Sequence, residues 1–227
     1  MKKGILTMVA ILCAVIVAQA QDWANLKKYE VANAAIQSRA ENKKSVVYMG
    51  DSITDFWISN DSVFFAAKPY LDRGISGQTT GQMLLRFRQD VINLKPGVVV
   101  ILAGINDIAE NNGPEKLEDI FGNIVSMAEL AKANHIKVVL SSLLPAFALP
   151  WRPAIDPLPK VKALNEMIKS YAYQNNIVYL DYFTAMADSR GGLPANLSKD
   201  GVHPNLAGYK IMEPLADKAV NEALKKR

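Results

Sequence analysis

The hydrophobic positions of this chain follow two patterns, short unbroken runs and longer stretches with helical spacing. The short runs are rich in β-branched residues and predict strands at residues 45–49, 70–73, 98–103, 136–140 and 177–180. Apolar residues every three or four positions predict helices near residues 23–39, 80–93, 114–134, 158–175 and 205–225. Pro114 suits the first position of a helix, and Pro214 is expected to kink or shorten the last one.

The alternation of these strands and helices predicts an α/β fold. Continuous apolar strands are typical of a parallel sheet that is covered on both faces. Right-handed crossovers between such strands give a three-layer α/β/α sandwich. In sheets of this kind the reactive groups gather at the carboxyl ends of the strands, so the residues after each strand are the candidates for chemistry.

The first 20 residues form a pattern distinct from the rest of the chain. Lys2 and Lys3 precede an uncharged apolar run, and Ala18-Gln19-Ala20 follows it. This layout predicts a secretory signal peptide cleaved after Ala20, which leaves one domain over residues 21–227 that is secreted or periplasmic. The run is shorter than the roughly 20 residues of a membrane-spanning helix, so no stable membrane anchor is expected. An uncleaved anchor is the alternative.

Composition excludes several classes of site and partner. The one cysteine, Cys13, would leave with the leader, so the mature chain has no thiol for a disulfide, for catalysis or for a metal. Leu12 before Cys13 also argues against a lipoprotein signal. The two histidines nearly exclude a metal site with several imidazole ligands, and no cofactor is expected. The net charge of +4 includes two leader lysines, so nothing points to nucleic acid. The oligomeric state is not determined.

Four polar segments follow predicted strands or precede the last helix. They are Gly50-Asp51-Ser52-Ile53-Thr54, Gly74-Ile75-Ser76-Gly77-Gln78-Thr79-Thr80, Gly104-Ile105-Asn106-Asp107 and Asp200-Gly201-Val202-His203-Pro204. Together they would bring a hydroxyl, glycine-rich backbone, a carboxamide, a carboxylate and an imidazole to one edge of the sheet. These are the groups that acyl transfer requires.

A serine hydroxyl needs a positioned base to become a nucleophile at neutral pH. His135 lies in a helix-to-strand turn at the wrong end of a strand, which leaves His203 as the candidate base for Ser52. Asp200, three residues before His203, can orient the imidazole and stabilise its charged form.

The oxyanion of an acyl-transfer intermediate needs hydrogen-bond donors. The Gly77 N–H, the Asn106 side-chain amide and the Ser52 N–H are the candidates, and glycine at 77 would let the backbone come close to a ligand. Each signal alone has an ordinary alternative. Gly-Asp-Ser is common in turns, Asn106-Asp107 can cap a helix, and Asp200 can cap a loop. The combination, in order and at strand ends, is much more specific.

These four segments resemble the blocks of the SGNH (or GDSL) hydrolases, and the resemblance spans residues 45–210. Ile53 stands where the family's name has leucine, a familiar variant. The resemblance implies a flavodoxin-like sandwich with five parallel strands in the order 2-1-3-4-5. It also implies the following roles: Ser52 as nucleophile, His203 and Asp200 as its partners, and Gly77, Asn106 and Ser52 as oxyanion donors.

The expected reaction is hydrolysis of an ester through an acyl-enzyme. By analogy with secreted relatives, the expected substrate is a small-molecule or glycan ester, with removal of acetyl or other short acyl groups from carbohydrate. A lysophospholipase or thioesterase activity is the alternative within the class. Two alternatives come from other classes. One is a metal-dependent phosphoesterase that would use Asp51, Asp107 and His203 as ligands, and the other is a non-catalytic secreted binding domain.

Three further side chains are candidate substrate contacts. Trp57 follows the nucleophile segment, and Trp151 and Arg152 lie in a proline-rich stretch, residues 145–153, that is also a candidate lid. A tryptophan can stack on a sugar or cover an acyl chain, and an arginine can pair with a carboxylate. Core packing for the tryptophans and solvation for Arg152 are the alternatives.

Overall fold

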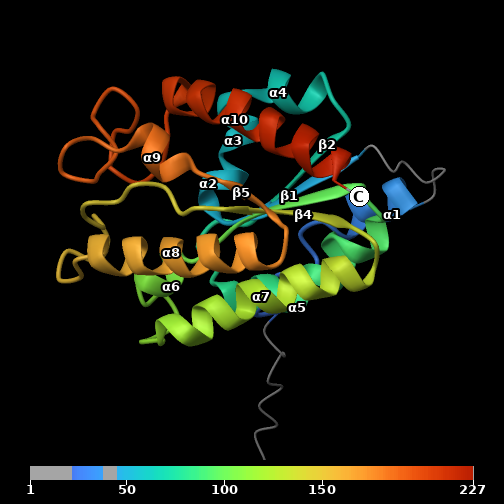
Figure 1. Cartoon of the computed structure of the whole chain (residues 1–227), viewed down its shortest axis with the longest axis horizontal. Helices are drawn as coiled ribbons and strands as arrows, with labels where there is room; N and C mark the ends of the chain where they lie inside the picture. The colour runs from blue at the N-terminus through green and yellow to red at the C-terminus, as the bar shows by residue number, and fades with distance from the viewer. Residues whose placement is uncertain (1–21, 38–44, 227) are drawn as a thin grey trace, which may run out of the picture.

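The computed structural model describes residues 22–37 and 45–226. The leader predicted for residues 1–20 lies outside the described residues. The described residues form a central sheet with helices packed on both of its faces (Figure 1). No helix in these two ranges is long and apolar enough to cross a membrane.

The sheet consists of five parallel strands in the order β2-β1-β3-β4-β5. Their bounds are β1 Val46–Gly50, β2 Tyr70–Gly74, β3 Val98–Leu102, β4 Lys137–Ser141 and β5 Val178–Leu180. Every residue of β1 and β3 is buried, because these strands lie inside the sheet with helices on both sides. The α/β fold predicted from the sequence pattern and the strand order implied by the family resemblance are both confirmed.

The longer helices cover the two faces of the sheet (Figure 1). One face packs against α10 with α3 and α4 beside it, and the other against α7 and α8 with α5 beside them. The bounds are α3 Trp57–Asn60, α4 Ser62–Ala66, α5 Thr80–Asp90, α7 Leu117–Ala133, α8 Leu158–Gln174 and α10 Leu206–Lys225.

Several short elements complete the described chain. Helix α1 packs near α5 and a short 3₁₀ helix, η1, while three short helices directly follow the ends of β1, β3 and β5. The bounds are α1 Glu30–Gln37, η1 Ile92–Leu94, α2 Ser52–Asp55, α6 Ile105–Ile108 and α9 Tyr182–Met186. The hydrophobic pattern did not predict α2, α6 or α9, because four or five residues are too few to show a helical period.

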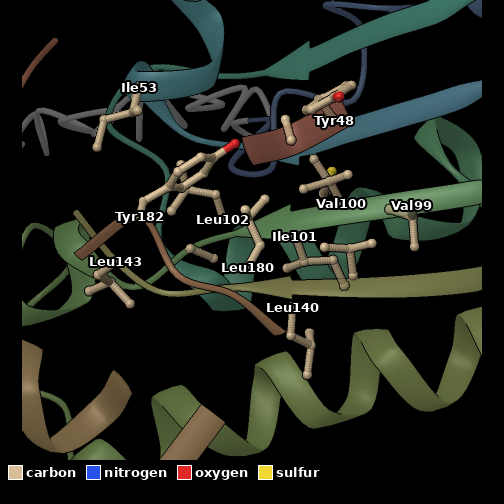
Figure 2. Packing of buried hydrophobic residues seen from close by; sticks show 14 of the residues in the cluster. Tyr48, Ile53, Val99, Val100, Ile101, Leu102, Leu140, Leu143, Leu180 and Tyr182 are labelled. Carbon is tan, nitrogen blue, oxygen red and sulfur yellow. The ribbon is translucent and has the colours of Figure 1, made fainter. Parts of the chain in front are cut away.

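Side chains of the strands and of the helices on both faces make the core. Figure 2 shows part of this cluster, with labelled residues Tyr48, Val99, Val100, Ile101, Leu102, Leu140 and Leu180 from the strands. Ile53, Leu143 and Tyr182, from just beyond strand ends, join the same cluster. Since Ile53 directly follows Ser52 and is 2% exposed, the core fixes the turn that carries the candidate nucleophile.

Two predicted helix starts were wrong. Helix α1 begins at Glu30 and not near Trp23, because the chain before it makes turns and Asn25 has a left-handed backbone with φ of 53°. Helix α7 begins at Leu117, since the backbone at Lys116 is still extended, and the proline expected at its first position lies outside it.

Of the two effects expected of Pro214, a kink or a shorter helix, the shortening does not occur. Helix α10 continues through Pro214 from Leu206 to Lys225. Proline removes the hydrogen bond to the carbonyl four residues earlier, which here belongs to Lys210. Both Pro214 and Lys210 are exposed, so water can satisfy that carbonyl.

Candidate active site

The carboxyl edge of the sheet carries the polar segments singled out in the sequence. Strand β1 leads into α2, which begins at Ser52, and β2 leads into residues 75–79, which include Gly77. Strand β3 leads into α6, which contains Asn106. Residues 200–204 precede α10 and reach the same edge, as the contacts of His203 show.

The backbone around Ser52 is fixed by its neighbours on both sides. Ser52 is the first residue of α2, so its N–H is not used within the helix. Oδ1 of Asp51 accepts a hydrogen bond from the Ile53 N–H at 2.9 Å and caps α2. At the end of β2, Gly74 packs so closely on this turn that a Cβ would lie 2.1 Å from the backbone N of Asp55.

Ser52, His203 and Asp200 form a hydrogen-bonded series. Oγ of Ser52 lies 2.8 Å from Nε2 of His203, and Nδ1 of His203 lies 2.6 Å from Oδ2 of Asp200. In this geometry the imidazole can take the hydroxyl proton while the carboxylate fixes its tautomer. His135 is exposed in the turn between α7 and β4, at the opposite edge of the sheet.

Asp200 is held by several donors besides the imidazole. Its Oδ1 accepts from the N–H groups of Val202 at 2.9 Å and His203 at 2.8 Å. Burial alone would raise the pKa of Asp200, but the hydrogen bonds from the His203 side chain and these N–H groups lower it to about 2. Asp200 is therefore ionised at neutral pH.

Ser198 is a residue of this site that no motif indicated. It is buried, and its hydroxyl lies 2.7 Å from the carbonyl oxygen of His203 and 3.1 Å from Oδ1 of Asp200. It also accepts a hydrogen bond from the Gly201 N–H at 2.9 Å. These hydrogen bonds close the loop that positions His203. Ser198 precedes the recognisable segment 200–204, and no motif in the sequence marks it.

The side-chain amide of Asn106 is buried and fixed in orientation. Its Nδ2 donates to the Gln78 carbonyl at 3.0 Å, and its Oδ1 accepts from Nδ2 of Asn111 at 2.9 Å. Gly77 has a φ of 80°, a conformation that favours glycine. A Cβ at position 77 would meet no protein atom within 4 Å, so the backbone conformation rather than crowding by the protein requires glycine here.

Two further carboxyls near the site have local partners. Asp107 accepts from the Thr80 N–H at 2.9 Å and from the Thr80 hydroxyl at 2.6 Å. Burial raises the pKa of Asp107 and raises that of Asp51 to about 7. Within the described ranges, no group of three or more histidine, cysteine or acidic side chains has an arrangement that could hold a metal ion.

The structure places Trp57 in the core, away from any ligand. Its side chain is 1% exposed and stacks on Phe64 and Tyr209, with ring centroids 4.9 Å and 5.3 Å away. A substrate cannot reach this ring without unpacking the core. The expectation that Trp57 contacts substrate is therefore corrected, and its packing alternative describes the residue.

Trp151 lies beside the candidate base, whereas Arg152 bonds the segment after α6. The Trp151 ring is 39% exposed, its centroid is 5.9 Å from that of His203, and its Nε1 donates to Oδ1 of Asn111 at 3.2 Å. Arg152 is exposed and donates to the Glu110 carbonyl at 3.3 Å. Of residues 145–153, Leu149 is fully buried and holds the segment against the body of the protein.

The sequence of this chain matches the model of the GDSL-like Lipase/Acylhydrolase family over residues 48–211. A solved structure of a GDSL-like lipase from Bacteroides thetaiotaomicron is 48% identical, with a TM-score of 0.86, and the match covers 88% of this chain and 99% of that one.

Two curated relatives are more distant. Esterase TesA of Pseudomonas aeruginosa is 30% identical over 137 residues, which are 60% of this chain and 62% of that protein. An acetylxylan esterase of Geobacillus stearothermophilus is 28% identical over 151 residues, which are 63% of this chain and 67% of that enzyme.

Proposed function

This chain belongs to the GDSL-like lipase/acylhydrolase family, and from that premise we propose that it is a serine esterase with Ser52 as its nucleophile. The observation that carries the proposal is the unbroken hydrogen-bonded series from Ser52 through His203 to an ionised Asp200. The series lies at the carboxyl edge of a parallel sheet, where α/β enzymes bind their ligands.

The geometry supports a two-step reaction. Oγ of Ser52 attacks the ester carbonyl and passes its proton to Nε2 of His203, while Asp200 stabilises the resulting imidazolium. The negative oxygen accepts hydrogen bonds from the N–H groups of Ser52 and Gly77 and from the Asn106 amide. When the intermediate collapses, His203 protonates the leaving alcohol. Water then attacks the acyl-enzyme by the same route and releases the acid.

The substrate class that we propose is a carbohydrate that carries acetyl or other short acyl esters. The acetylxylan esterase relative supports this class, and the partly exposed Trp151 ring beside His203 offers a flat apolar face for a sugar. Hydrolysis of long-chain lysophospholipid or thioester substrates is the second candidate. The exposed ring of Phe147, 52% accessible in the 145–153 segment, is the observation that favours it.

We also propose that the enzyme acts outside the cytoplasm. The proposal rests on the leader pattern of residues 1–20. Expression of the full chain followed by sequencing of the mature N-terminus tests it. Cleavage after Ala20 is expected, and a protein that keeps Met1 after export would contradict it.

The test of the catalytic proposal is the loss of turnover in the variant Ser52→Ala. We expect hydrolysis of p-nitrophenyl acetate to fall by at least 10³-fold, because the attacking oxygen is removed. Ser126→Ala is the matched control, since Ser126 is on α7 and bonds the Gly122 carbonyl of its own helix. A fluorophosphonate probe should label the native enzyme at Ser52. Undiminished turnover in Ser52→Ala would overturn the proposal.

A series of p-nitrophenyl esters from acetyl to palmitoyl separates the two substrate classes. We expect kcat/KM to be highest for acetyl and to fall with chain length. A maximum at long chains would favour the lipid alternative. The same assay in the presence of EDTA tests the metal-dependent phosphoesterase alternative, which an undiminished rate would contradict. Failure of the serine probe to label the enzyme would revive the non-catalytic alternative.

A further inference from the structure

A hollow adjoins the candidate active site at Gly77. It is a groove of about 470 Å³ between residues 75–78, the ends of Gln82 and Asn112, and the N-terminal segment 22–25. We propose that this groove binds the sugar chain of an oligosaccharide ester, with Trp23 as the platform on which one sugar ring stacks. The inference rests on the proposed esterase function and adds where the alcohol side of the substrate lies.

The N-terminal side of the groove is held in place by glutamine side chains of the neighbouring loop and helix. Nε2 of Gln78 donates to the Ala24 carbonyl at 2.7 Å, and Nε2 of Gln82 donates to the Trp23 carbonyl at 2.6 Å. Two helical turns further along α5, Gln89 donates to the Leu26 carbonyl at 2.6 Å. The backbone of this segment is thus attached to α5, although the segment has no strand and little helix of its own.

The backbone of Trp23 is fixed by a hydrogen bond, while its side chain is exposed to solvent. The ring is 48% exposed, and its nearest approach to position 81 is 3.8 Å, measured from Cη2 to a Cβ built on Gly81. A large aromatic side chain on a fixed backbone offers an apolar face at low entropic cost on binding, because it has only two side-chain torsions. A sugar ring has such a C–H face to place against it.

The chemistry of the remaining lining fits a neutral polyhydroxyl ligand. Amides and a hydroxyl come from Asn25, Ser76, Gln82 and Asn112, and such groups both donate to and accept from hydroxyls. None of the described residues that line the groove is lysine or arginine, and Asp22 would repel a phosphate or sulfate. Apart from Trp23 the lining has one large apolar side chain, that of Ile75, which is too little to bury a long acyl chain.

Two residues that line the groove connect it to the candidate catalytic residues. Gly77, a proposed oxyanion donor, forms part of the groove. Asn111 also lines it, donates to Asn106 and accepts from Trp151, whose ring neighbours that of His203. A chain whose ester lies at Ser52 can therefore extend over Gly77 toward Trp23.

The experiment compares Trp23→Ala with the native enzyme on partially acetylated xylotetraose and on p-nitrophenyl acetate. We expect KM for the oligosaccharide to rise about five- to tenfold, as for loss of one aromatic contact, with kcat nearly unchanged. kcat/KM for p-nitrophenyl acetate should stay within about twofold, because this small ester does not reach the groove. Trp23→Tyr should restore most of the affinity.

Tyr173→Ala is the matched control, because Tyr173 is 67% exposed on α8 and does not line the groove. It should leave both substrates unaffected. A Trp23→Ala enzyme with an unchanged oligosaccharide KM overturns the inference, and so does one that loses both activities equally. In the first case, continued turnover of p-nitrophenyl acetate would show that the esterase proposal still holds.

If the native enzyme does not hydrolyse acetylated xylotetraose, a binding measurement tests the inference. Ser52→Ala is titrated with xylotetraose, cellotetraose and chitotetraose by calorimetry. Binding of one of them that weakens at least fivefold in Ser52→Ala/Trp23→Ala supports the inference. Absence of binding of all three at millimolar concentration overturns it.

Discussion

Asp51 and Asp200 both lie beside the candidate nucleophile, yet their surroundings move their pKa values in opposite directions. Asp200 receives hydrogen bonds from the His203 ring and from backbone N–H groups, which favour its charge. Asp51 is 1% exposed, and within the described residues its Oδ2 has no hydrogen-bond partner. The Asp200 carboxyl is suited to stabilise an imidazolium, and the Asp51 carboxyl is suited to cap α2 in its neutral form.

Asp51 should make folding stability fall as the pH rises. Burial raises its pKa to about 7, against about 3.9 in an unfolded chain. Between these values the folded protein keeps a proton that the unfolded chain has lost, so its stabilising effect is complete below about pH 4 and lost by about pH 7. A shift of about three units corresponds to about 4 kcal/mol.

The variant Asp51→Asn tests this, because asparagine resembles the neutral carboxyl and does not titrate. Its free energy of unfolding, relative to that of the native protein, should increase between pH 4 and pH 7.5 when measured by urea denaturation. Asp188→Asn should show the opposite sign in a lower pH range: hydrogen bonds from Arg190 lower the pKa of Asp188, so its stability relative to the native protein should fall as the pH rises to about 4 and stay nearly constant above about pH 5. A pH-independent difference for Asp51→Asn would contradict the expectation.

Among single residues, the sequence indicated the candidate reacting groups but not the residues that support them. Ser52, His203 and Asn106 are in recognisable segments at predicted strand ends, so parallel strands alone place most of them at one edge. Ser198 and Asn111 orient these groups through hydrogen bonds of their side chains. Serine and asparagine are common in loops, so nothing in the sequence distinguishes them before the fold is known.

Helix α5 connects several parts of the candidate site. Its first residue, Thr80, donates to Asp107 of α6, and the side chain of Arg86 is fully buried. The Arg86 guanidinium donates to Oε1 of Gln78 at 2.5 Å, to Asp90 at 3.0 Å and to the Gly50 carbonyl at 3.0 Å. One side chain therefore joins the end of β1 to the loop that carries Gly77.

The variant Arg86→Met should be strongly destabilised. It leaves Asp90 as a buried charge without its cation, a change that costs about 3–5 kcal/mol. Urea denaturation measures the loss. Arg190→Met is the control, since the Arg190–Asp188 pair is at the surface and should contribute less than about 1 kcal/mol. If both variants lose the same small amount, the buried pair is not the constraint described here.

Among the elements, unbroken apolar runs and long helical patterns were predicted well, and interrupted patterns and helices of four or five residues were not. The strands at 98–103 and 177–180 and the helix at 158–175 agree closely with β3, β5 and α8. Residues 22–29 contain apolar side chains at near-helical spacing but fold as turns. Hydrogen bonds from glutamines of α5 and its preceding loop to their carbonyls take the place of helical ones.

Over the whole molecule, an aromatic cluster supports the nucleophile turn from the opposite side. Trp57 packs against Tyr48 of β1 and Tyr209 of α10, and the Tyr209 hydroxyl donates to the Ile53 carbonyl at 2.8 Å. The sheet, α10 and the short helices after β1 therefore meet behind Ser52. The sequence marks Trp57 as close to the nucleophile, and only the fold shows that it faces the core.

Trp57→Ala should therefore affect stability more than substrate affinity. Removing a buried indole costs about 3–5 kcal/mol, measured by urea denaturation. KM for p-nitrophenyl acetate should be nearly unchanged in the fraction that remains folded. Trp151→Ala is the matched control and should cost less than about 1 kcal/mol, because that ring is partly exposed. The reverse order of the two losses would contradict the assignment of Trp57 to the core.

The two ends of the described chain leave the molecule at different places. Asp22 and Trp23 line the groove beside Gly77, whereas Nζ of Lys226 donates to the carbonyl of Asn176, just before β5 begins at the far edge of the sheet. A purification tag or fusion partner joined directly to Asp22 would obstruct the approach of a polymer. Attachment to a solid support through the last residues of α10 would keep that approach clear for large, insoluble material.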